Sequence, residues 1–349
     1  MNNPHLSLSD DEKLTFVSNF STMLTAGISV LEISTSLLED AKGNLKKVLE
    51  TLKDNIIQGK RLYHTFAQFP STFDKVTVNL IKAAEEAGTL EVSLKDLKQN
   101  LIKDIEFKDK IKAALIYPAL IGVVFAGVLL MILIFIMPKI SQIFSKLKVD
   151  LPLPTRIMIF VSNTILAYTI PIIVFLAIFF IFIIFFYKRQ KRLLTNFIFS
   201  LPLLSLLAKE IDLTNFARSF SLLLRSGIPI ISALELTEDI AMKKEVGKAI
   251  HHARNMVLSG KKLSEAFKDN KKVIPTIMIK ITEAGEKSGA LEKTMQEASE
   301  YLDYRVTKTL KTVTTMIEPI MLVLVGVAVG AMMLAIISPM YGMIGQMGR

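Results

Sequence analysis

Three long apolar runs separate two mostly polar segments of the chain. Each run is close to the about 20 residues that a helix needs to cross the hydrocarbon core of a membrane. Core helices of soluble proteins rarely stay apolar on every face for that length. We therefore predict an integral membrane protein with transmembrane helices at 113–137, 164–187 and 313–338.

The polar segments show helical periodicity. Ser9 and Glu12 fit a capping box at the start of the first segment. Apolar residues then step by four and three along one helix face, and no strand-like alternation competes. We predict an all-α membrane protein with two helical bundles of about six helices each. The two apolar stripes are Leu90, Leu94, Leu97, Leu101 and Ile105, and Leu291, Met295, Ala298, Leu302 and Val306.

The second bundle repeats the first. The sequence "FVSNFSTMLTAGISV" from Phe16 matches "FARSFSLLLRSGIPI" from Phe216, 200 positions later. After a slip of one residue, "GKRLYHTF" from Gly59 matches "GKKLSEAF" from Gly260, and "AEEAGTLEV" matches "GEKSGALEK". A repeat of this length indicates duplication of a structural unit.

The duplication includes the span that follows each bundle. Tyr117 and Pro118 in the first predicted span match Glu318 and Pro319 in the third. The second span is then a linker that returns the chain to the side of the first bundle. The predicted organisation is a first bundle at 1–112, an external loop at 138–163, a second bundle at 188–312 and an external tail at 339–349.

Four glycines are predicted to end helices. Gly27 and Gly227 lie where a helix stops in a left-handed turn. Gly88 and Gly289 stand between an amphipathic helix and the long helix that enters a span, which predicts a tight joint. The glutamates of this joint, Glu85 and Glu286, are expected to be solvated or to cap a helix. The chain lacks the P-loop pattern that a phosphate cradle would need.

The net charge of +10 raises the possibility of nucleic-acid binding, but the charges flank the spans instead. Such placement is typical of residues held on the cytoplasmic side of a membrane. We expect both bundles in the cytoplasm and an anionic lipid surface, rather than nucleic acid, as the partner of these charges. The basic residues are Lys108, Lys110, Lys112, Lys188, Arg189, Lys191, Arg192, Arg305, Lys308 and Lys311. The loop sequence "LPLPT", 151–155, is predicted to be an extended spacer.

The sequence shows no pattern of catalytic residues. There is no cysteine, and the four histidines form no spaced pair with a glutamate on one helix face. No serine lies in a nucleophile elbow. We predict a protein that is not an enzyme and has no cofactor-binding or metal site.

Two features of the third span have either a functional or a purely structural explanation. Glu318 lies where a charged group is costly unless it meets a polar partner or sits at the headgroup level, and the sequence leaves both open. Pro319 beside it can bend the helix. Gly326 and Gly330 form a small-residue step that favours close approach of another helix.

Taken together, the repeated motifs resemble one family. The "FSTMLTAGI" and "FSLLLRSGI" pair, the "AEEAGTLE" and "GEKSGALE" pair, "YPAL", "LPLPT" and "EPIM" resemble the platform proteins of type II secretion and type IV pilus machines, including the competence-pilus members. The resemblance covers nearly the whole chain. It implies an inner-membrane platform that is not itself catalytic and couples a hexameric ATPase to assembly of pilin or pseudopilin subunits, beside other inner-membrane assembly proteins.

The chain departs from the family pattern at one motif. "AEEAG" in the first copy differs from "GEKSG" in the second, so a role of this motif is assigned to Glu286 and Gly289 rather than to Glu85 and Gly88. The small-residue face and the machine axis predict a homo-oligomer. Two other classes of protein fit less well. A transporter would duplicate a set of spans around a midplane site, and a receptor would need an external domain larger than the predicted loop.

Overall fold

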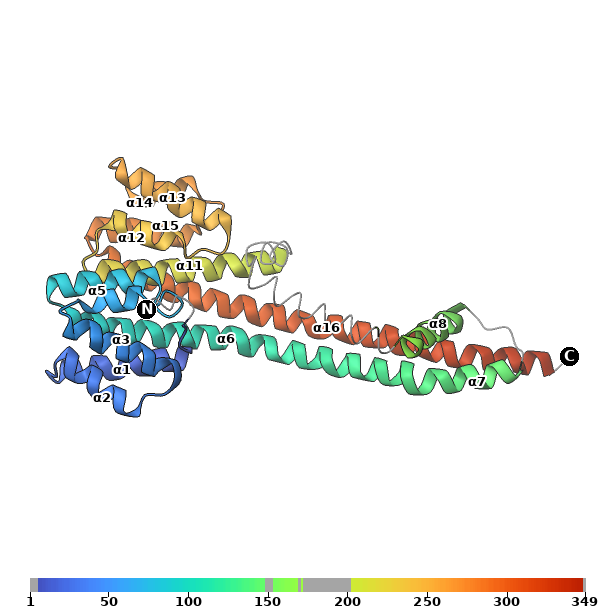
Figure 1. Ribbon diagram of the computed structural model, residues 1–349. Coiled ribbons are helices and arrows are strands. Elements are labelled where there is room, and N and C mark those ends of the chain that lie inside the picture. The colour runs from blue at the N-terminus through green and yellow to red at the C-terminus, as the bar shows by residue number, and fades with distance from the viewer. Residues whose placement is uncertain (1–5, 148–152, 169–170, 172–201, 348–349) are drawn as a thin grey trace. The chain divides into compact units, whose positions relative to one another are not determined.

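The computed structural model describes residues 6–147, 153–168, 171 and 202–347 (Figure 1). The chain divides into two units. The first contains Met1–Lys110 and Ile198–Lys308, and the second contains Ile111–Phe197 and Thr309–Arg349. Within the described residues, the regular elements are all helical.

Both repeats lie in the first unit, and each contributes six helices among the described residues, so the predicted pair of helical bundles is confirmed. Helices of the two repeats correspond one to one along the chain. The first repeat consists of α1 (Asp10–Thr25), α2 (Val30–Asp40), α3 (Gly43–Ile57), α4 (Leu62–Ala67), α5 (Lys75–Ala87) and the start of α6 (Leu90–Met131). The second consists of α11 (Pro202–Arg225), α12 (Ile230–Glu238), α13 (Lys244–Leu258), α14 (Leu263–Asp269), α15 (Thr276–Ser288) and the start of α16 (Leu291–Met347).

Local sequence signals set the helix ends as predicted. The Glu12 carboxylate accepts a hydrogen bond from the Ser9 backbone N–H at 2.8 Å, and the Ser9 hydroxyl accepts one from the Glu12 N–H at 3.2 Å. This reciprocal pair is the predicted capping box, and it satisfies donors that a helix N-terminus leaves unpaired. Gly27 and Gly227 follow α1 and α11 with φ of 80° and 78°, so their left-handed conformation is confirmed.

Each repeat has its own aromatic core, and each core also contains a side chain from the other repeat. Phe66 and Phe73 stack at 4.1 Å between ring centroids in the first core. Phe216 and Phe220 stack at 5.4 Å in the second. Leu222 of the second repeat packs in the first core, and Val76 of the first repeat packs in the second. The two bundles of the first unit therefore share apolar packing.

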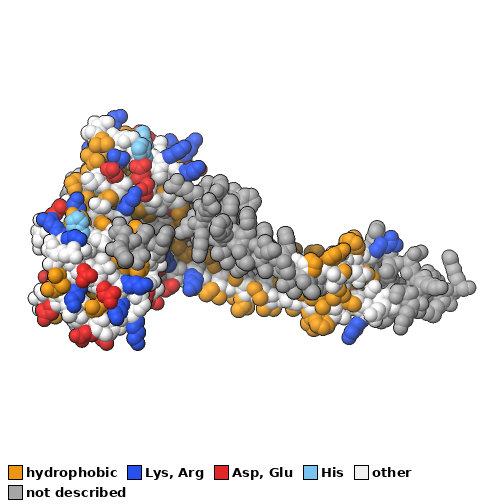
Figure 2. All heavy atoms as spheres, in the orientation of Figure 1, with side chains coloured by type: hydrophobic (Ala, Val, Ile, Leu, Met, Phe, Trp, Pro, Cys, Tyr) orange, Lys and Arg blue, Asp and Glu red, His pale blue; other side chains and the backbone are white. Residues whose placement is uncertain are grey.

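The second unit contains parts of two helices that are long and apolar enough to span a membrane. The candidate spans lie in Leu90–Gln142 and Leu291–Ala331, which include the first predicted transmembrane segment and most of the third. Figure 2 shows hydrophobic side chains at the surface of these helices and many charged side chains at the surface of the bundles. The predicted span at 164–187 lies mostly outside the described residues, and it stays a prediction.

A proline changes the hydrogen bonding of the first of these helices. After α6 the chain continues through a π-helical turn (Ile132–Ile136) into α7 (Met137–Leu147). In that turn the Met137 N–H donates to the Ile132 carbonyl. Pro138 has no N–H, so the Leu133 carbonyl lacks the donor that the next π bond would supply. The hydroxyl of Ser162 in α8 (Leu153–Ala167) donates to that carbonyl instead, at 2.6 Å.

Helices α7 and α8 occupy much of the segment predicted as a loop, 138–163, and α8 continues past it to Ala167. The prediction that "LPLPT" is extended is wrong from Leu153 onward, because α8 begins there; 151–152 lie outside the described residues. Proline is tolerated in the first turn of a helix, where its missing N–H would have no partner. The side of the membrane on which this segment lies stays a prediction.

The two repeats differ by a matched pair of small residues. A Cβ placed on Gly285 would overlap Thr294 Oγ1 and lie 3.1 Å from Leu291 Cα. The first repeat has Ala84 and Ser93 at these two positions, both buried. Serine lacks the second Cβ substituent of threonine, so its hydroxyl can turn away from an added methyl group.

We expect Gly285→Ala to lower the free energy of unfolding by about 1–3 kcal/mol through overpacking. Adding Thr294→Ser should restore most of this loss, because the pair then matches the first repeat. The measurement is thermal unfolding of the detergent-solubilised chain. A Gly285→Ala variant as stable as the parent, or a double variant no better than the single one, would contradict the prediction.

Candidate functional site

The repeated glutamate caps a neighbouring helix in both repeats. Glu85 accepts hydrogen bonds from the backbone N–H groups of Leu62, at 2.7 Å, and Tyr63, at 2.9 Å. These groups belong to the first turn of α4, whose own N-cap residue makes no side-chain cap. A carboxylate at this position satisfies unpaired donors and favours the positive end of the helix dipole.

The second repeat does the same with its own residues. Glu286 Oε1 accepts from the backbone N–H of Leu263 at 2.6 Å and from that of Ser264 at 3.3 Å, at the start of α14. Of the two roles that the sequence left open for these glutamates, the structure therefore has the cap. Both glutamates make the cap, because the carboxylate is kept in the change from "GEKSG" to "AEEAG". The assignment of a functional role to Glu286 rather than Glu85 stays a prediction.

Glycine makes the joint that places each glutamate. Gly88 ends α5 with φ of 71°, and Gly289 ends α15 with φ of 69°. Their left-handed conformation is the one predicted, and it costs a glycine little. The joint turns the chain from α5 into α6, or from α15 into α16. The repeated motif therefore connects a bundle to the helix that continues toward a span.

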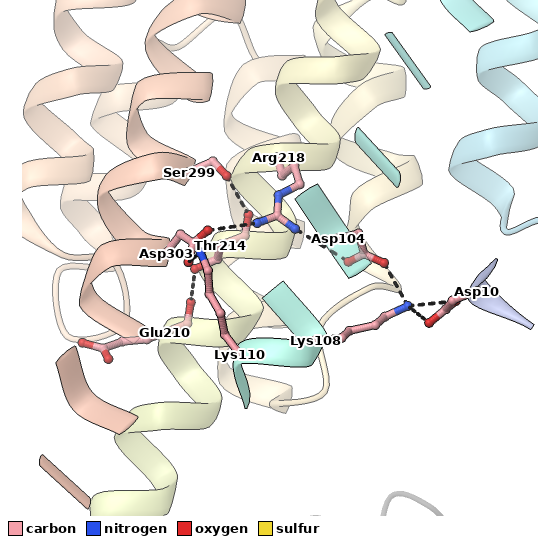
Figure 3. A network of polar contacts seen from close by, with 9 residues as sticks. All are labelled: Asp10, Asp104, Lys108, Lys110, Glu210, Thr214, Arg218, Ser299 and Asp303. Atoms are coloured by element: carbon pink, nitrogen blue, oxygen red, sulfur yellow. Dashed lines mark hydrogen bonds and ion pairs between the residues drawn. The ribbon is translucent and has the colours of Figure 1, made fainter. Parts of the chain in front are cut away.

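A buried arginine joins the two repeats. Arg218 in α11 is only 5% exposed, and its Nη1 lies 3.6 Å from Oδ1 of Asp104 in α6. Its Nη2 lies 3.8 Å from Oδ2 of Asp303 in α16. The guanidinium also lies over the Phe107 ring, 5.0 Å from the centroid. Figure 3 shows the arginine between the two carboxylates.

The charge on Arg218 depends on these two acids. Burial lowers the pKa of the guanidinium below its ordinary value, while Asp104 and Asp303 oppose that shift. Because the pKa of arginine starts above about 12, the group stays charged near neutral pH. A buried charge is stable only when it keeps its counterions. The geometry therefore ties α11 to the starts of both long helices.

Further ion pairs surround this arginine, which makes the contact a network. Lys108 Nζ lies 2.9 Å from Asp104 and 3.1 Å from Asp10, so it links α6 to α1. Arg305 Nη2 lies 2.7 Å from Glu210 Oε1, which links α16 to α11. A cavity of about 220 Å³ lies beside Arg218. Its lining residues are Asp96, Gln99, Asn100, Lys103, Ser221, Leu222, Arg225, Gln296 and Glu300, with Arg218 itself.

Sequence reasoning missed Arg218. The first repeat has Ser18 at the matching position, so the repeat does not mark it. A lone arginine in "FARSFS" is also typical of a solvated helix face. One signal was available, because α11 carries apolar residues on either side of Arg218, including Ala217, Phe220 and Leu222. A helix that is apolar on several faces is usually buried between neighbours.

The remaining predicted residues lie in the second unit. Tyr117 and Pro118 lie within α6 and Tyr117 is half exposed. Glu318, in α16, is exposed and has no partner among the described residues. Neither predicted role of Glu318 is tested by this arrangement, and both stay predictions.

Three other predicted positions on α16 also keep their roles only as predictions. Pro319 lies within that helix. Among the described residues, no atom outside the local backbone lies within 4 Å of a Cβ placed on Gly326 or Gly330. Among the described residues, no group of three or more metal-ligating side chains occurs.

Fold and sequence together define a membrane protein built from a duplicated helical unit. The model of the family "Type II secretion system (T2SS), protein F" matches residues 16–138 and 216–339, one match for each repeat and the helix that follows it. The chain belongs to this family. The resemblance inferred from the motifs is confirmed.

Characterised relatives cover nearly the whole chain. It is 28% identical over 336 residues to the type IV pilus assembly protein PilC of Thermus thermophilus, covering 95% of this chain and 82% of that one. It is 27% identical over 335 residues to PilC of Pseudomonas aeruginosa, with 93% and 88% covered. It is 24% identical over 337 residues to the type II secretion system protein F of Aeromonas hydrophila, with 95% and 86% covered.

The glutamate caps give a prediction for both repeats. We expect Glu85→Gln and Glu286→Gln each to lower the free energy of unfolding by about 1 kcal/mol, because a neutral amide replaces a charge-assisted cap. The two sites lie in different repeats, so the losses should add. Thermal unfolding in detergent measures them. The exposed Glu50→Gln variant is the matched control, and equal stability of all three variants would contradict the cap.

Proposed function

We propose that this chain is the inner-membrane platform of a type II secretion or type IV pilus machine. In this role it couples a cytoplasmic hexameric ATPase to the assembly of pilin or pseudopilin subunits into a filament. Membership of the protein F family and the names of its PilC and protein F relatives support the proposal. The proposed platform is a scaffold without catalysis of its own.

One structural observation carries the coupling part of the proposal. Arg218 pairs with Asp104 of α6 and Asp303 of α16, the two helices that also contain the candidate spans. A force applied to either bundle would therefore reach the starts of both helices through one buried contact. Scaffolds that transmit motion need such contacts, since soft contacts would absorb the displacement.

The proposed setting follows from the sequence. Both bundles lie in the cytoplasm, where the ATPase is, and the chain crosses the membrane more than once. The basic residues that flank the spans contact anionic lipid. Pilin stems meet the spans, beside other inner-membrane assembly proteins. The chain acts as a homo-oligomer and does not contact nucleic acid directly.

The proposal is tested by the proteins that accompany the chain. A tagged copy is solubilised gently from its own membranes, recovered and analysed by mass spectrometry. We expect a hexameric ATPase and a pilin-like protein, both depleted when the membranes come from a strain that lacks the chain. A stable preparation that brings neither, and whose melting temperature shifts with a soluble metabolite, would overturn the platform in favour of transport or sensing.

Arg218 separates coupling from binding. We expect Arg218→Met to retain at least half of the ATPase recovery and to lose at least tenfold in filament assembly. Methionine fills similar volume but cannot pair with Asp104 and Asp303, so the two long helices lose their common tie. Surface filament is measured by shearing and immunoblotting.

The matched control is Arg254→Met, which removes a half-buried arginine of α13 that pairs with Glu235 and Glu238 within the second repeat. Filament assembly should survive that change. If Arg218→Met assembles filament at the parental level, the arginine is not the coupling contact.

A further inference from the structure

The contact between the two repeats uses one face of α6. Asp96 and Asp104 of this helix pair with Arg225 and Arg218 of α11, at 3.5 Å and 3.6 Å. The order of these pairs shows that the two helices run antiparallel. Leu222 of α11 lies midway between its two arginines and Asn100 of α6 lies midway between the two aspartates, and both line the cavity described above.

Part of the matching face of the second repeat is exposed, although Arg305, the counterpart of Asp104, pairs with Glu210 of α11. Asn100 and Lys103 of α6 correspond to Tyr301 and Tyr304 of α16, which are 39% and 65% exposed. A third position also differs in exposure between the two repeats. Val76 of α5 is 6% exposed because it packs into the second repeat, whereas its counterpart Ile277 of α15 is 37% exposed. We call Ile277, Tyr301 and Tyr304 the open face.

Two exposed tyrosines one helical turn apart on α16 are typical of a protein interface. Tyrosine is enriched at the centre of interfaces because it offers a large apolar ring with a polar end. In a chain of repeats, each unit presents the same two surfaces, and the surface of the last unit stays uncovered unless another copy binds. The open face is the uncovered counterpart of a contact that the chain already makes internally.

The counterpart of α11 in the first repeat is also uncovered. Leu222 and Arg225 correspond to Thr22 and Thr25 of α1, which are both exposed. The sizes are exchanged at the central position of each contact. Inside the chain, the large Leu222 of α11 and the smaller Asn100 of α6 line the same cavity. On the uncovered surfaces, small hydroxyl side chains of α1 would face the two large tyrosines of α16, so the volumes remain complementary.

We propose that the open face binds α1 of a second copy of this chain, which repeats between molecules the contact that the two repeats make within one. The register follows from the internal pairs. Thr22 would lie opposite Tyr301, as Leu222 lies opposite Asn100. Such a head-to-tail contact joins two different surfaces, and it closes into a ring or continues as a filament. It does not depend on which ATPase or subunit the platform serves.

The chain lacks cysteine, so introduced pairs can be tested without background. The test uses full-length chain in its own membranes, with Thr22→Cys on one tagged copy and Tyr301→Cys on another. Mild oxidation should link the two tags, with a linked fraction at least fivefold above either variant alone. The control is Leu258→Cys, a position of α13 that is more exposed than Tyr301 (54% against 39%) and should not link to Thr22→Cys.

A second experiment exchanges side-chain sizes across the contact, in case a cysteine perturbs it. Ser18→Arg on α1 should at least halve the linked fraction, because arginine meets a face that already holds two tyrosines. Adding Tyr301→Asn and Tyr304→Lys recreates Asn100 and Lys103 of α6, which line the cavity beside Arg218 inside the chain, so the combination should recover oligomer size measured by light scattering in detergent.

Three results would overturn the inference. The first is linking of Tyr301→Cys to itself as strongly as to Thr22→Cys, because α16 would then pair with α16. The second is linking to a different protein. The third is a chain that stays monomeric in its membranes and in detergent, with no linked product from any pair.

Discussion

The buried charge of Arg218 is the constraint on which the arrangement of the two repeats depends. Moving a guanidinium out of water costs several kcal/mol, and two carboxylates must repay it. The contacts at 3.6 Å and 3.8 Å are longer than hydrogen bonds, so attraction between charges dominates the interaction. If either α6 or α16 left α11, the buried arginine would lose one of its two counterions. The arginine thus fixes position more than it adds stability.

Much of the fold could be predicted because its signals are local. A positive φ at Gly88 or Gly289 follows from glycine between two helical patterns, and the capping box at Ser9 needs only four residues. The partner of Glu85 could not be predicted, because Leu62 lies 23 positions away and only the packing of α5 against α4 brings them together. Arg218 was missed for the same reason. Its two carboxylates come from different repeats.

The first long helix shows a limit of another kind. Composition predicts that it can span a membrane, but composition does not show how the helix passes Pro138. Where water is scarce, a carbonyl left without a donor costs several kcal/mol, so some group must supply one. Ser162 does so from a different helix, at 2.6 Å. A sequence pattern marks the proline that creates the need and gives no sign of the serine that meets it.

Comparison of the repeats separates what the fold requires from what one copy does. Glu85 and Glu286 make the same cap, and Gly88 and Gly289 make the same joint. These positions are therefore needed for the unit to fold. Ser18 and Arg218 occupy matching positions but differ in size and charge, and the difference falls where one repeat meets the other. In this chain, the buried charge of Arg218 belongs to only one copy of the unit, and it pairs with an acid of the other copy. This diverged position therefore lies where the two bundles pack against each other.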